Sequence, residues 1–200
     1  MIPRFIRPQG ERRYRRMFVI VAEGTVTEPQ YFSLLSEESI VKVICLKNTN
    51  GLTPEKALNH IEKYVREEGL EEAKGDEAWV VVDRDSWPEN HFDALHTWAK
   101  KKSNYGFALS NPKFEYWLLL HFEDAKGVTT SKHCDDRLKK HISGYKKHID
   151  SQHYPREKID AAVTRAKQRD NPPCKDWPRD PPGSTVYKLV EKILESRTNP

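Results

Sequence analysis

Apolar and polar positions follow two different patterns along this chain. Short, largely apolar runs, many of them valine and isoleucine, occupy positions 17–22, 40–46, 78–82 and 105–109. Such runs are typical of strands that are buried on both faces. Between them, apolar residues recur every three or four positions, which is the spacing of a helix face. Four alternations of strand and helix predict an α/β fold with an open, mainly parallel sheet flanked by helices.

Capping residues mark the positions where several of these helices are expected to begin. Thr27 and Gln30 have the spacing of a capping box, with a proline between them in the first turn. Thr53 precedes a proline and is expected to cap the second helix. Asn111, also before a proline, is expected to begin the helix after the fourth strand.

The last third of the chain has no strand pattern. From Glu123 onward the apolar spacing is helical, positions 171–183 hold five prolines, and Ser184 or Thr185 is expected to cap a final helix. The pattern therefore predicts three parts: a basic N-terminal arm over 1–16, an α/β domain over 17–125, and a helical extension over 126–200 packed on that domain.

Composition excludes several classes of protein. A chain of 200 residues suits one compact domain with an appendage, and its mean hydropathy of −0.83 is polar for a globular protein. No apolar run is long enough to cross a bilayer, and the N-terminus lacks the apolar centre of a signal peptide. We therefore expect a soluble, cytoplasmic protein. The three cysteines are far apart in sequence, which argues against a thiolate zinc site or a disulfide scaffold.

Carboxylates follow three of the four expected strands. Glu23 comes directly after the first strand, Asp83 and Asp85 after the third, and Glu115 shortly after the fourth. Because the carboxyl ends of parallel strands meet at one edge of the sheet, these groups are expected to converge. Carboxylates in that position repel one another unless a cation neutralises them, so the pattern predicts a site for Mg²⁺ or Mn²⁺. Glu28 lies in a first helical turn, where it suits the helix dipole as well as it suits a metal.

Four stretches resemble the RloB-like family of bacterial proteins, in the same order and over almost the whole chain after the arm. They are VAEGTVTEPQYF, VVDRDSWP, LSNPKFEYWLLLHF and STVYKLVEKIL. The resemblance implies that positions 17–125 form a Toprim-like domain, the metal-binding module shared by topoisomerases, primases and OLD-type nucleases. In the Toprim pattern a glutamate follows the first strand and Asp-x-Asp follows the third, which corresponds here to Glu23, Asp83 and Asp85.

The same resemblance implies further site residues and a biological context. In OLD-type nucleases the acidic cluster holds two metal ions and a lysine assists, and the nearest counterparts here are Glu28, Glu115 and Lys113. RloB-like genes occur beside restriction-modification genes, and related Toprim effectors work with ATPases in antiphage defence. The chain has no phosphate-binding GxxxxGK[ST] motif, so any nucleotide hydrolysis would come from a partner chain.

Basic residues are concentrated in two places although the net charge is only +4. The arm holds six arginines, which suit either phosphate contacts or a solvated tail. A second basic segment around positions 132–148 is interleaved with Tyr145 and two histidines, which suits nucleic-acid binding or a solvated helix face equally. The residues taken as nucleic-acid contacts are Arg12, Arg13, Arg15, Arg16, Lys139, Lys140, Lys146 and Lys147.

These patterns together predict a metal-dependent nuclease acting on RNA or DNA. Glu23, Asp83 and Asp85 are the expected catalytic acids, with two Mg²⁺ or Mn²⁺ ions held also by Glu28 and Glu115, and Lys113 would offset charge in the transition state. One alternative is a non-catalytic nucleic-acid-binding or sensor subunit that works with a partner ATPase. Another is a nucleotide-sugar transferase that binds Mn²⁺ through its Asp-x-Asp, although this does not explain Glu23 or the arm. A homo-oligomer is compatible with each interpretation.

Overall fold

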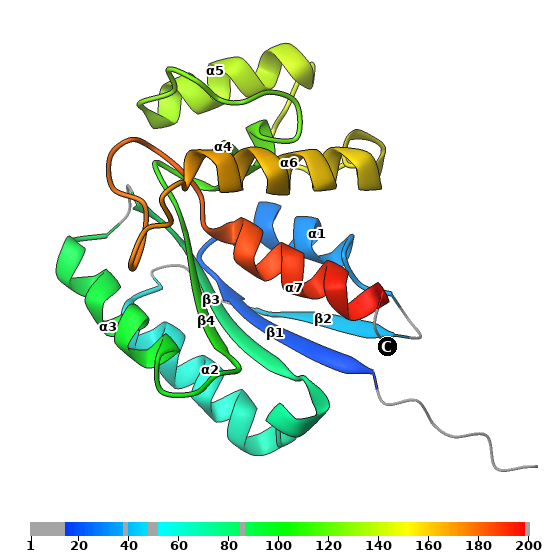
Figure 1. Cartoon of the computed structure of the whole chain (residues 1–200), viewed down its shortest axis with the longest axis vertical. Helices are drawn as coiled ribbons and strands as arrows, with labels where there is room; N and C mark the ends of the chain where they lie inside the picture. The colour runs from blue at the N-terminus through cyan, green and yellow to red at the C-terminus, as the bar shows by residue number, and fades with distance from the viewer. Residues whose placement is uncertain (1–14, 38–39, 48–51, 85–86, 199–200) are drawn as a thin grey trace, which may run out of the picture.

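A sheet of four parallel strands forms the centre of the protein, whose computed structural model describes residues 15–37, 40–47, 52–84 and 87–198. The strands lie in the order β2-β1-β3-β4 (Figure 1). After β2 the chain crosses back over β1, so the direction in which strands are added reverses between β1 and β3. The expected α/β fold class is confirmed. The strands are β1 Arg16–Ala22, β2 Val41–Leu46, β3 Glu77–Asp83 and β4 Tyr105–Ser110.

Helices cover both faces of the sheet. One face carries α2 and α3, the other carries α1 and α7, and α5 and α6 lie beyond α1 and α7 (Figure 1). No described helix is both long and apolar enough to cross a membrane. The α-helices are α1 Thr27–Ser33, α2 Pro54–Glu68, α3 Glu89–Ala99, α4 Phe114–Leu119, α5 Ser131–His141, α6 Arg156–Arg169 and α7 Val186–Thr198, and short 3₁₀ helices are η1 Glu72–Lys74 and η3 Ser151–His153.

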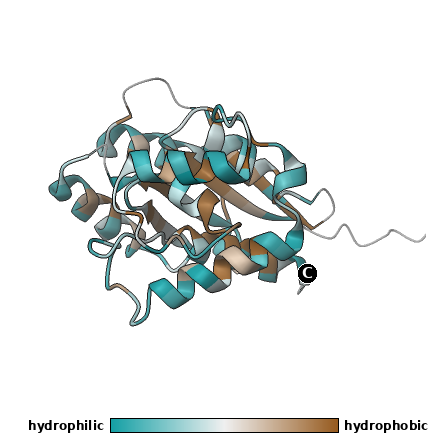
Figure 2. Cartoon of the chain, turned by 90° about the horizontal axis from the view of Figure 1, so that it is seen from above, coloured by the Kyte–Doolittle hydropathy of each residue, from teal (hydrophilic) through white to brown (hydrophobic). Residues whose placement is uncertain are grey.

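Each face of the sheet has its own core. Phe18 and Ile20 of β1 pack toward α1 and α7, whereas Val19 and Val21 pack toward α2 and α3. All four side chains are buried. Seen from above, the hydrophobic strands lie between helices whose outer faces are hydrophilic (Figure 2). Burial on both faces explains why the strand runs are continuously apolar rather than alternating.

Gly106 of β4 lies against the indole ring of Trp79 on β3. A Cβ atom at position 106 would be 2.3 Å from Trp79 Cδ2, and the ring is buried with its Nε1 donating to Glu77 Oε2 at 2.8 Å. We therefore predict that Gly106→Ala lowers the free energy of unfolding by roughly 1–3 kcal/mol, the usual cost of overpacking. Urea denaturation measures this, and a midpoint equal to that of the wild type would contradict the close contact.

The start of α1 differs from the expected capping box. The residue before the helix is Val26, and no side chain caps it. Thr27 Oγ1 instead donates to the backbone oxygen of Lys147 at 2.9 Å. Gln30 Oε1 accepts from the backbone N–H of Ile149 at 2.9 Å. The predicted capping box is wrong because both side chains bind a segment more than a hundred residues away in the sequence.

Of the two proline-marked helix starts, one is confirmed and one is wrong. Thr53 caps α2, because its side chain accepts from the backbone N–H of Lys56 at 3.3 Å. Asn111 does not begin α4, which starts at Phe114. The backbone N–H of Asn111 donates to the oxygen of Gly183 at 2.8 Å, so this residue joins the end of β4 to the proline-rich segment.

The proline-rich segment also prepares the start of α7. After Glu123, all residues up to position 198 are described, and they form helices but no strand, as expected. Ser184 Oγ accepts from the backbone N–H of Val186, the first residue of α7, at 3.3 Å. Thr185 Oγ1 instead accepts from the backbone N–H of Leu109 at 2.9 Å. The proline-rich segment and the residues that follow it therefore lie against the end of β4, which is an edge strand of the sheet.

A buried histidine makes stability depend on pH. His121 Nδ1 lies 3.1 Å from the backbone oxygen of Trp117, to which it donates, so its Nε2 accepts from the Tyr31 hydroxyl at 3.0 Å. Burial lowers the pKa of His121 to about 3, and the nearby positive charges of Arg165 and Lys158 also lower it. The imidazole is therefore neutral in the folded protein at neutral pH.

This arrangement predicts loss of stability in mild acid. In the unfolded chain His121 takes up a proton near its ordinary pKa of 6.5, whereas the folded protein does not do so until about pH 3. The free energy of unfolding should therefore fall by up to about 1.4 kcal/mol per pH unit as the pH drops from 6.5 toward 3. His121→Gln should flatten this slope in urea titrations at successive pH values, whereas His148→Gln, at an exposed position, should not. Equal slopes for the wild type and His121→Gln would contradict the assignment.

Candidate functional site

The reversal of strand order brings Glu23 and Asp83 together. Glu23 follows β1, and its backbone N–H donates to the oxygen of Val81 at 3.0 Å, which continues the pairing of β1 with β3. Asp83 ends β3, and its backbone N–H donates to Glu23 Oε2 at 3.1 Å. Ligands of open α/β sheets bind outside the carboxyl ends of strands at such a reversal. The two acids are therefore placed where this class of fold forms sites.

Glu28 approaches the same edge from the first turn of α1. The backbone N–H of Gly24 donates to Glu28 Oε1 at 3.1 Å, and the side chain is buried. Burial raises the pKa of Glu28 to about 7, and the carboxylates of Glu115 and Glu23 raise it as well. The Glu28 carboxylate thus binds the backbone of the turn before α1 and also lies among other acids.

Glu115 joins the group from α4, with Lys113 beside it. Lys113 Nζ lies 3.8 Å from Glu115 Oε2 and 2.8 Å from Asp135 Oδ1 of α5. Burial lowers the pKa of Lys113, but the hydrogen bond to Asp135 and the charge of Glu115 more than offset this and raise it above its ordinary value. The ammonium therefore stays protonated between the two carboxylates.

Two residues that contact Lys113 or Glu115, namely Asp135 and Tyr145, were not predicted from the sequence to do so. Asp135 lies within a basic helical segment, where no motif or spacing distinguishes it from Asp136. Tyr145 lies in a segment that suited a nucleic-acid surface and a solvated helix face equally, and its ring could stack on bases only in the first case. The side chain is buried, and its hydroxyl donates to Glu115 Oε1 at 3.4 Å. The stacking role of Tyr145 is therefore wrong, because its ring packs in the core beneath the site.

Electrostatic coupling joins these groups, and we call Glu23, Glu28, Asp83 and Glu115 the acidic cluster. Glu28 is coupled to Glu23 and Glu115. Burial raises the pKa of the Cys134 thiol of α5 to about 12, and the charges of Glu115 and Asp83 raise it further. The acidic cluster thus gathers carboxylates from three segments that are far apart in sequence, with Lys113 at its border.

The acidic cluster fits a hard divalent cation in its donor chemistry. All its donors are carboxylate oxygens, which Mg²⁺ and Mn²⁺ prefer. Burial is the main cause of the raised pKa of Glu28, and the charges of Glu115 and Glu23 add to it. Within the described residues, however, no three His, Cys, Asp or Glu side chains have an arrangement that would hold a metal ion. Asp85 lies outside the described residues. Metal binding therefore stays a prediction.

A comparison with family models decides the relationship of the chain. The model of the RloB-like protein family matches residues 18–193. The chain belongs to this family. The match covers the sheet except for the first two residues of β1, and it includes the acidic cluster and most of α7. No curated protein matches the sequence.

The basic residues of this RloB-like protein lie at different distances from the acidic cluster. Arg12 and Arg13 lie outside the described residues. Arg15 and Arg16 stand at the start of β1, the end of the sheet opposite Glu23 (Figure 1), and Arg16 Nη1 donates to Ser196 Oγ at 3.3 Å. Arg15 and Arg16 therefore lie far from the acidic cluster.

The four lysines of the second basic segment are all exposed. Lys139 and Lys140 belong to the last turn of α5, and Lys146 and Lys147 follow in the next loop. Because Thr27 Oγ1 binds the backbone oxygen of Lys147, this loop lies next to the first turn of α1, which carries Glu28. Nucleic-acid contact by these lysines stays a prediction.

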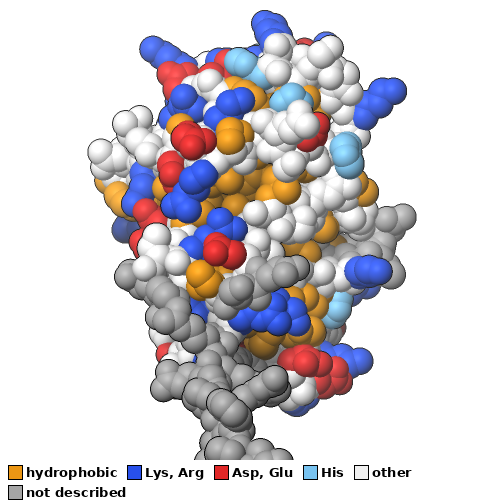
Figure 3. Space-filling view, turned by 90° about the vertical axis from the view of Figure 1, so that its right-hand side faces the viewer, with side chains coloured by type: hydrophobic (Ala, Val, Ile, Leu, Met, Phe, Trp, Pro, Cys, Tyr) orange, Lys and Arg blue, Asp and Glu red, His pale blue; other side chains and the backbone are white. Residues whose placement is uncertain are grey.

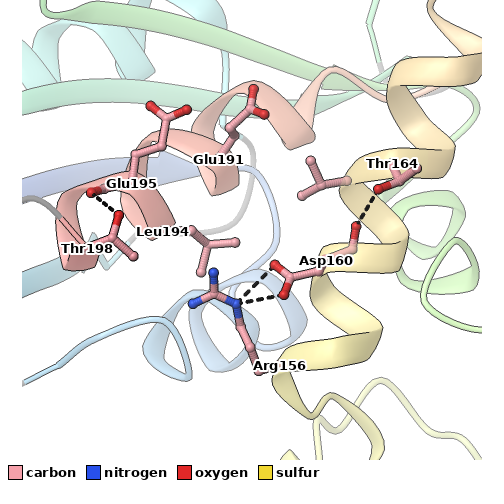
Figure 4. A pocket seen from close by; sticks show the side chains of 8 residues that line it. Arg156, Asp160, Thr164, Glu191, Leu194, Glu195 and Thr198 are labelled. Atoms are coloured by element: carbon pink, nitrogen blue, oxygen red, sulfur yellow. Dashed lines mark hydrogen bonds and ion pairs between the residues drawn. The ribbon is translucent and has the colours of Figure 1, made fainter.

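A hollow on the surface of the described residues lies away from the acidic cluster, between two C-terminal helices. A cavity of about 270 Å³ lies between α6 and α7, where Arg156 Nε donates to both oxygens of Asp160 at 3.0 Å (Figure 4). On the face drawn in Figure 3, basic and acidic side chains are interspersed rather than separated by sign. That view therefore lacks the basic patch typical of a nucleic-acid surface.

Proposed function

We propose that this RloB-like protein is a divalent-metal-dependent nuclease of the Toprim type, acting as an effector in antiphage defence. The observation that carries the proposal is the acidic cluster at the strand-order reversal, with the Lys113 ammonium at its border. Glu23 and Asp83 stand where the Toprim pattern has its metal-binding acids. Asp85 would complete that pattern.

The residues of the chain have separate tasks in this proposal. Glu23, Asp83 and Asp85 would hold the cation, with Glu28 and Glu115 as further carboxylate donors. When bound, Mg²⁺ or Mn²⁺ supplies Lewis-acid stabilisation of the phosphodiester and lowers the pKa of water. Lys113 would place positive charge where negative charge develops on the phosphorus oxygens.

Substrate binding follows from the position of the basic loop. The loop carrying Lys146 and Lys147 is fixed to α1 through Thr27 and Gln30. Lysines in this position would contact phosphates of the bound strand, which gives affinity without base specificity. The proposal therefore covers RNA and DNA as substrates.

Cleavage assays test the activity directly. Purified protein is incubated with transfer RNA, single-stranded DNA or duplex DNA, in Mn²⁺ or in EDTA. We expect cleavage of at least one substrate in Mn²⁺ and none in EDTA. Binding without cleavage of any of the three would favour a nucleic-acid-binding or sensor subunit and contradict the nuclease. Addition of a partner ATPase then shows whether the RloB-like chain acts alone.

Metal binding has a test that does not depend on cleavage. Millimolar Mn²⁺ should raise the melting temperature of the wild type, because a ligand that binds only the folded state stabilises it by mass action. Asp83→Asn should remove most of this shift, whereas Asp136→Asn, an exposed change on α5, should keep it. A wild-type melting temperature that does not respond to Mn²⁺ or Mg²⁺ would exclude the proposed cofactor.

A further inference from the structure

We propose that Asp135 is a positioning residue that holds the Lys113 ammonium away from Glu115 and directed at the substrate. This inference rests on the proposed function for its catalytic consequence, but its geometry stands on the described residues. Lys113 Nζ is 2.8 Å from Asp135 Oδ1, a hydrogen-bonded ion pair, and 3.8 Å from Glu115 Oε2, beyond hydrogen-bond range. Of two nearby carboxylates, the ammonium is therefore bonded to the one outside the acidic cluster.

The burial of Lys113, Glu115 and Asp135 explains why it matters that the ammonium pairs with Asp135 and not with Glu115. Lys113 and Glu115 keep only 12% and 5% of their side-chain surface exposed, whereas Asp135 keeps 36%. An ammonium in so enclosed a place needs a carboxylate partner. Among the described residues, Glu115 is the other carboxylate within 4 Å of the ammonium, and a direct ion pair there would neutralise a candidate metal ligand. Asp135 keeps both Lys113 and Glu115 available.

The Lys113 ammonium has more N–H donors than its bond to Asp135 uses, so it can also bind a substrate. A lysine ammonium has three N–H donors, and its long side chain has high conformational freedom unless a partner fixes it. One donor binds Asp135. The others remain for acceptors on the side of the acidic cluster, where a phosphate oxygen would lie. Asp135 thereby orients Lys113 and does not itself contact the substrate.

The packing of α5 does not depend on this ion pair. Cys134 and Leu138 of α5 are fully buried and belong to the same core as Trp117 of α4. These apolar contacts hold α5 in place on either side of Asp135. Replacement of Asp135 should therefore leave the fold intact, so that its effect on Lys113 can be measured separately.

The test compares Asp135→Asn with Asp136→Asn, a matched change at the next and exposed position of α5. We expect Asp135→Asn to lower kcat about 10- to 100-fold, the usual cost of losing a partner that orients a reactive group, with KM nearly unchanged. Asp135→Glu should restore part of the loss, and Asp136→Asn should behave as wild type. Wild-type kcat in Asp135→Asn, or a change only in melting temperature, would overturn the inference.

A second measurement separates this inference from the nuclease proposal. The hydrogen-bonded ammonium of Lys113 should give a slowly exchanging signal in nitrogen-15 spectra of lysine side chains, identified by its absence in Lys113→Met. Asp135→Asn should shift or broaden this signal, and Asp136→Asn should not. If the wild type cleaves no nucleic acid, the proposed function fails, and the spectra alone decide the role of Asp135. An unchanged Lys113 signal in Asp135→Asn would refute that role.

Discussion

Replacement of Glu23 by glutamine should lower the turnover of Mn²⁺-dependent cleavage by about 10³-fold or more, the scale of losing preorganised charge stabilisation. Glu23 is held rigidly, because its backbone pairs with Val81 and its carboxylate accepts from the N–H of Asp83. The variant keeps the size of the side chain but loses its charge. Folding should not suffer, since less repulsion remains within the acidic cluster.

Single variants of the other members of the acidic cluster should lose turnover to different extents. Asp83→Asn should match the loss in Glu23→Gln, because both residues stand at strand ends. Glu28→Gln and Glu115→Gln should give intermediate losses, since these side chains reach the edge from helices. Glu55→Gln, in the exposed first turn of α2, serves as control and should change nothing.

The decisive measurements are the cleavage rate at saturating Mn²⁺ and the melting temperature without metal. Metal-free unfolding of Glu23→Gln and Asp83→Asn at lower temperature, with cleavage by the folded fraction at the wild-type rate, would assign these acids to the fold. The nuclease proposal would then lose its chemical basis.

Gly24→Ala should lower turnover about as strongly as Glu28→Gln, although Gly24 has no functional group. A Cβ atom at position 24 would be 1.9 Å from Glu28 Oε2, where no two such atoms can lie. The Glu28 carboxylate is buried and bound to the N–H of Gly24, so it must leave its position to make room. Because only the end of one side chain must move, we expect a small change in stability and a large one in cleavage.

A double variant isolates this effect. If the new methyl group acts only by displacing Glu28, then adding Gly24→Ala to Glu28→Ala should cost no further activity, since the carboxylate is already absent. Cleavage rates of the two single variants and the double variant give the coupling energy directly. Additive losses in the double variant would show that Gly24→Ala disturbs the backbone between β1 and α1 instead.

The pattern of the sequence was sufficient for the sheet and for one part of the acidic cluster. The strands could be located because a parallel strand buried on both faces must be apolar at nearly every position, a signal carried within each run. The approach of Glu23 to Asp83 was predictable for the same local reason, since each residue follows such a run and parallel strands end at one edge. Thr53 was a correct cap because its partner, Lys56, lies in the same turn of chain.

The contacts that the tertiary structure alone decided all join distant segments. Thr27 and Gln30 had the spacing of a capping box, but their polar groups bind Lys147 and Ile149, because a long-range hydrogen bond competes directly with a local one. The charged neighbours of Tyr145 in the sequence suggested an exposed ring, but the ring is buried because of the way the loop after α5 packs. Pairing among distant residues is set by packing rather than by spacing.

The border of the acidic cluster shows this division most clearly. The sequence placed Glu23 and Asp83 at strand ends, where the backbone of the sheet fixes their positions. It could not show that Lys113 binds Asp135. Lys113 directly precedes α4 and Asp135 lies in α5, and the shared core of Trp117, Cys134 and Leu138 sets the relative position of these two helices. Sequence periodicity states which face of a helix is buried, whereas only the packed core determines which charged groups at its rim come within 3 Å of one another.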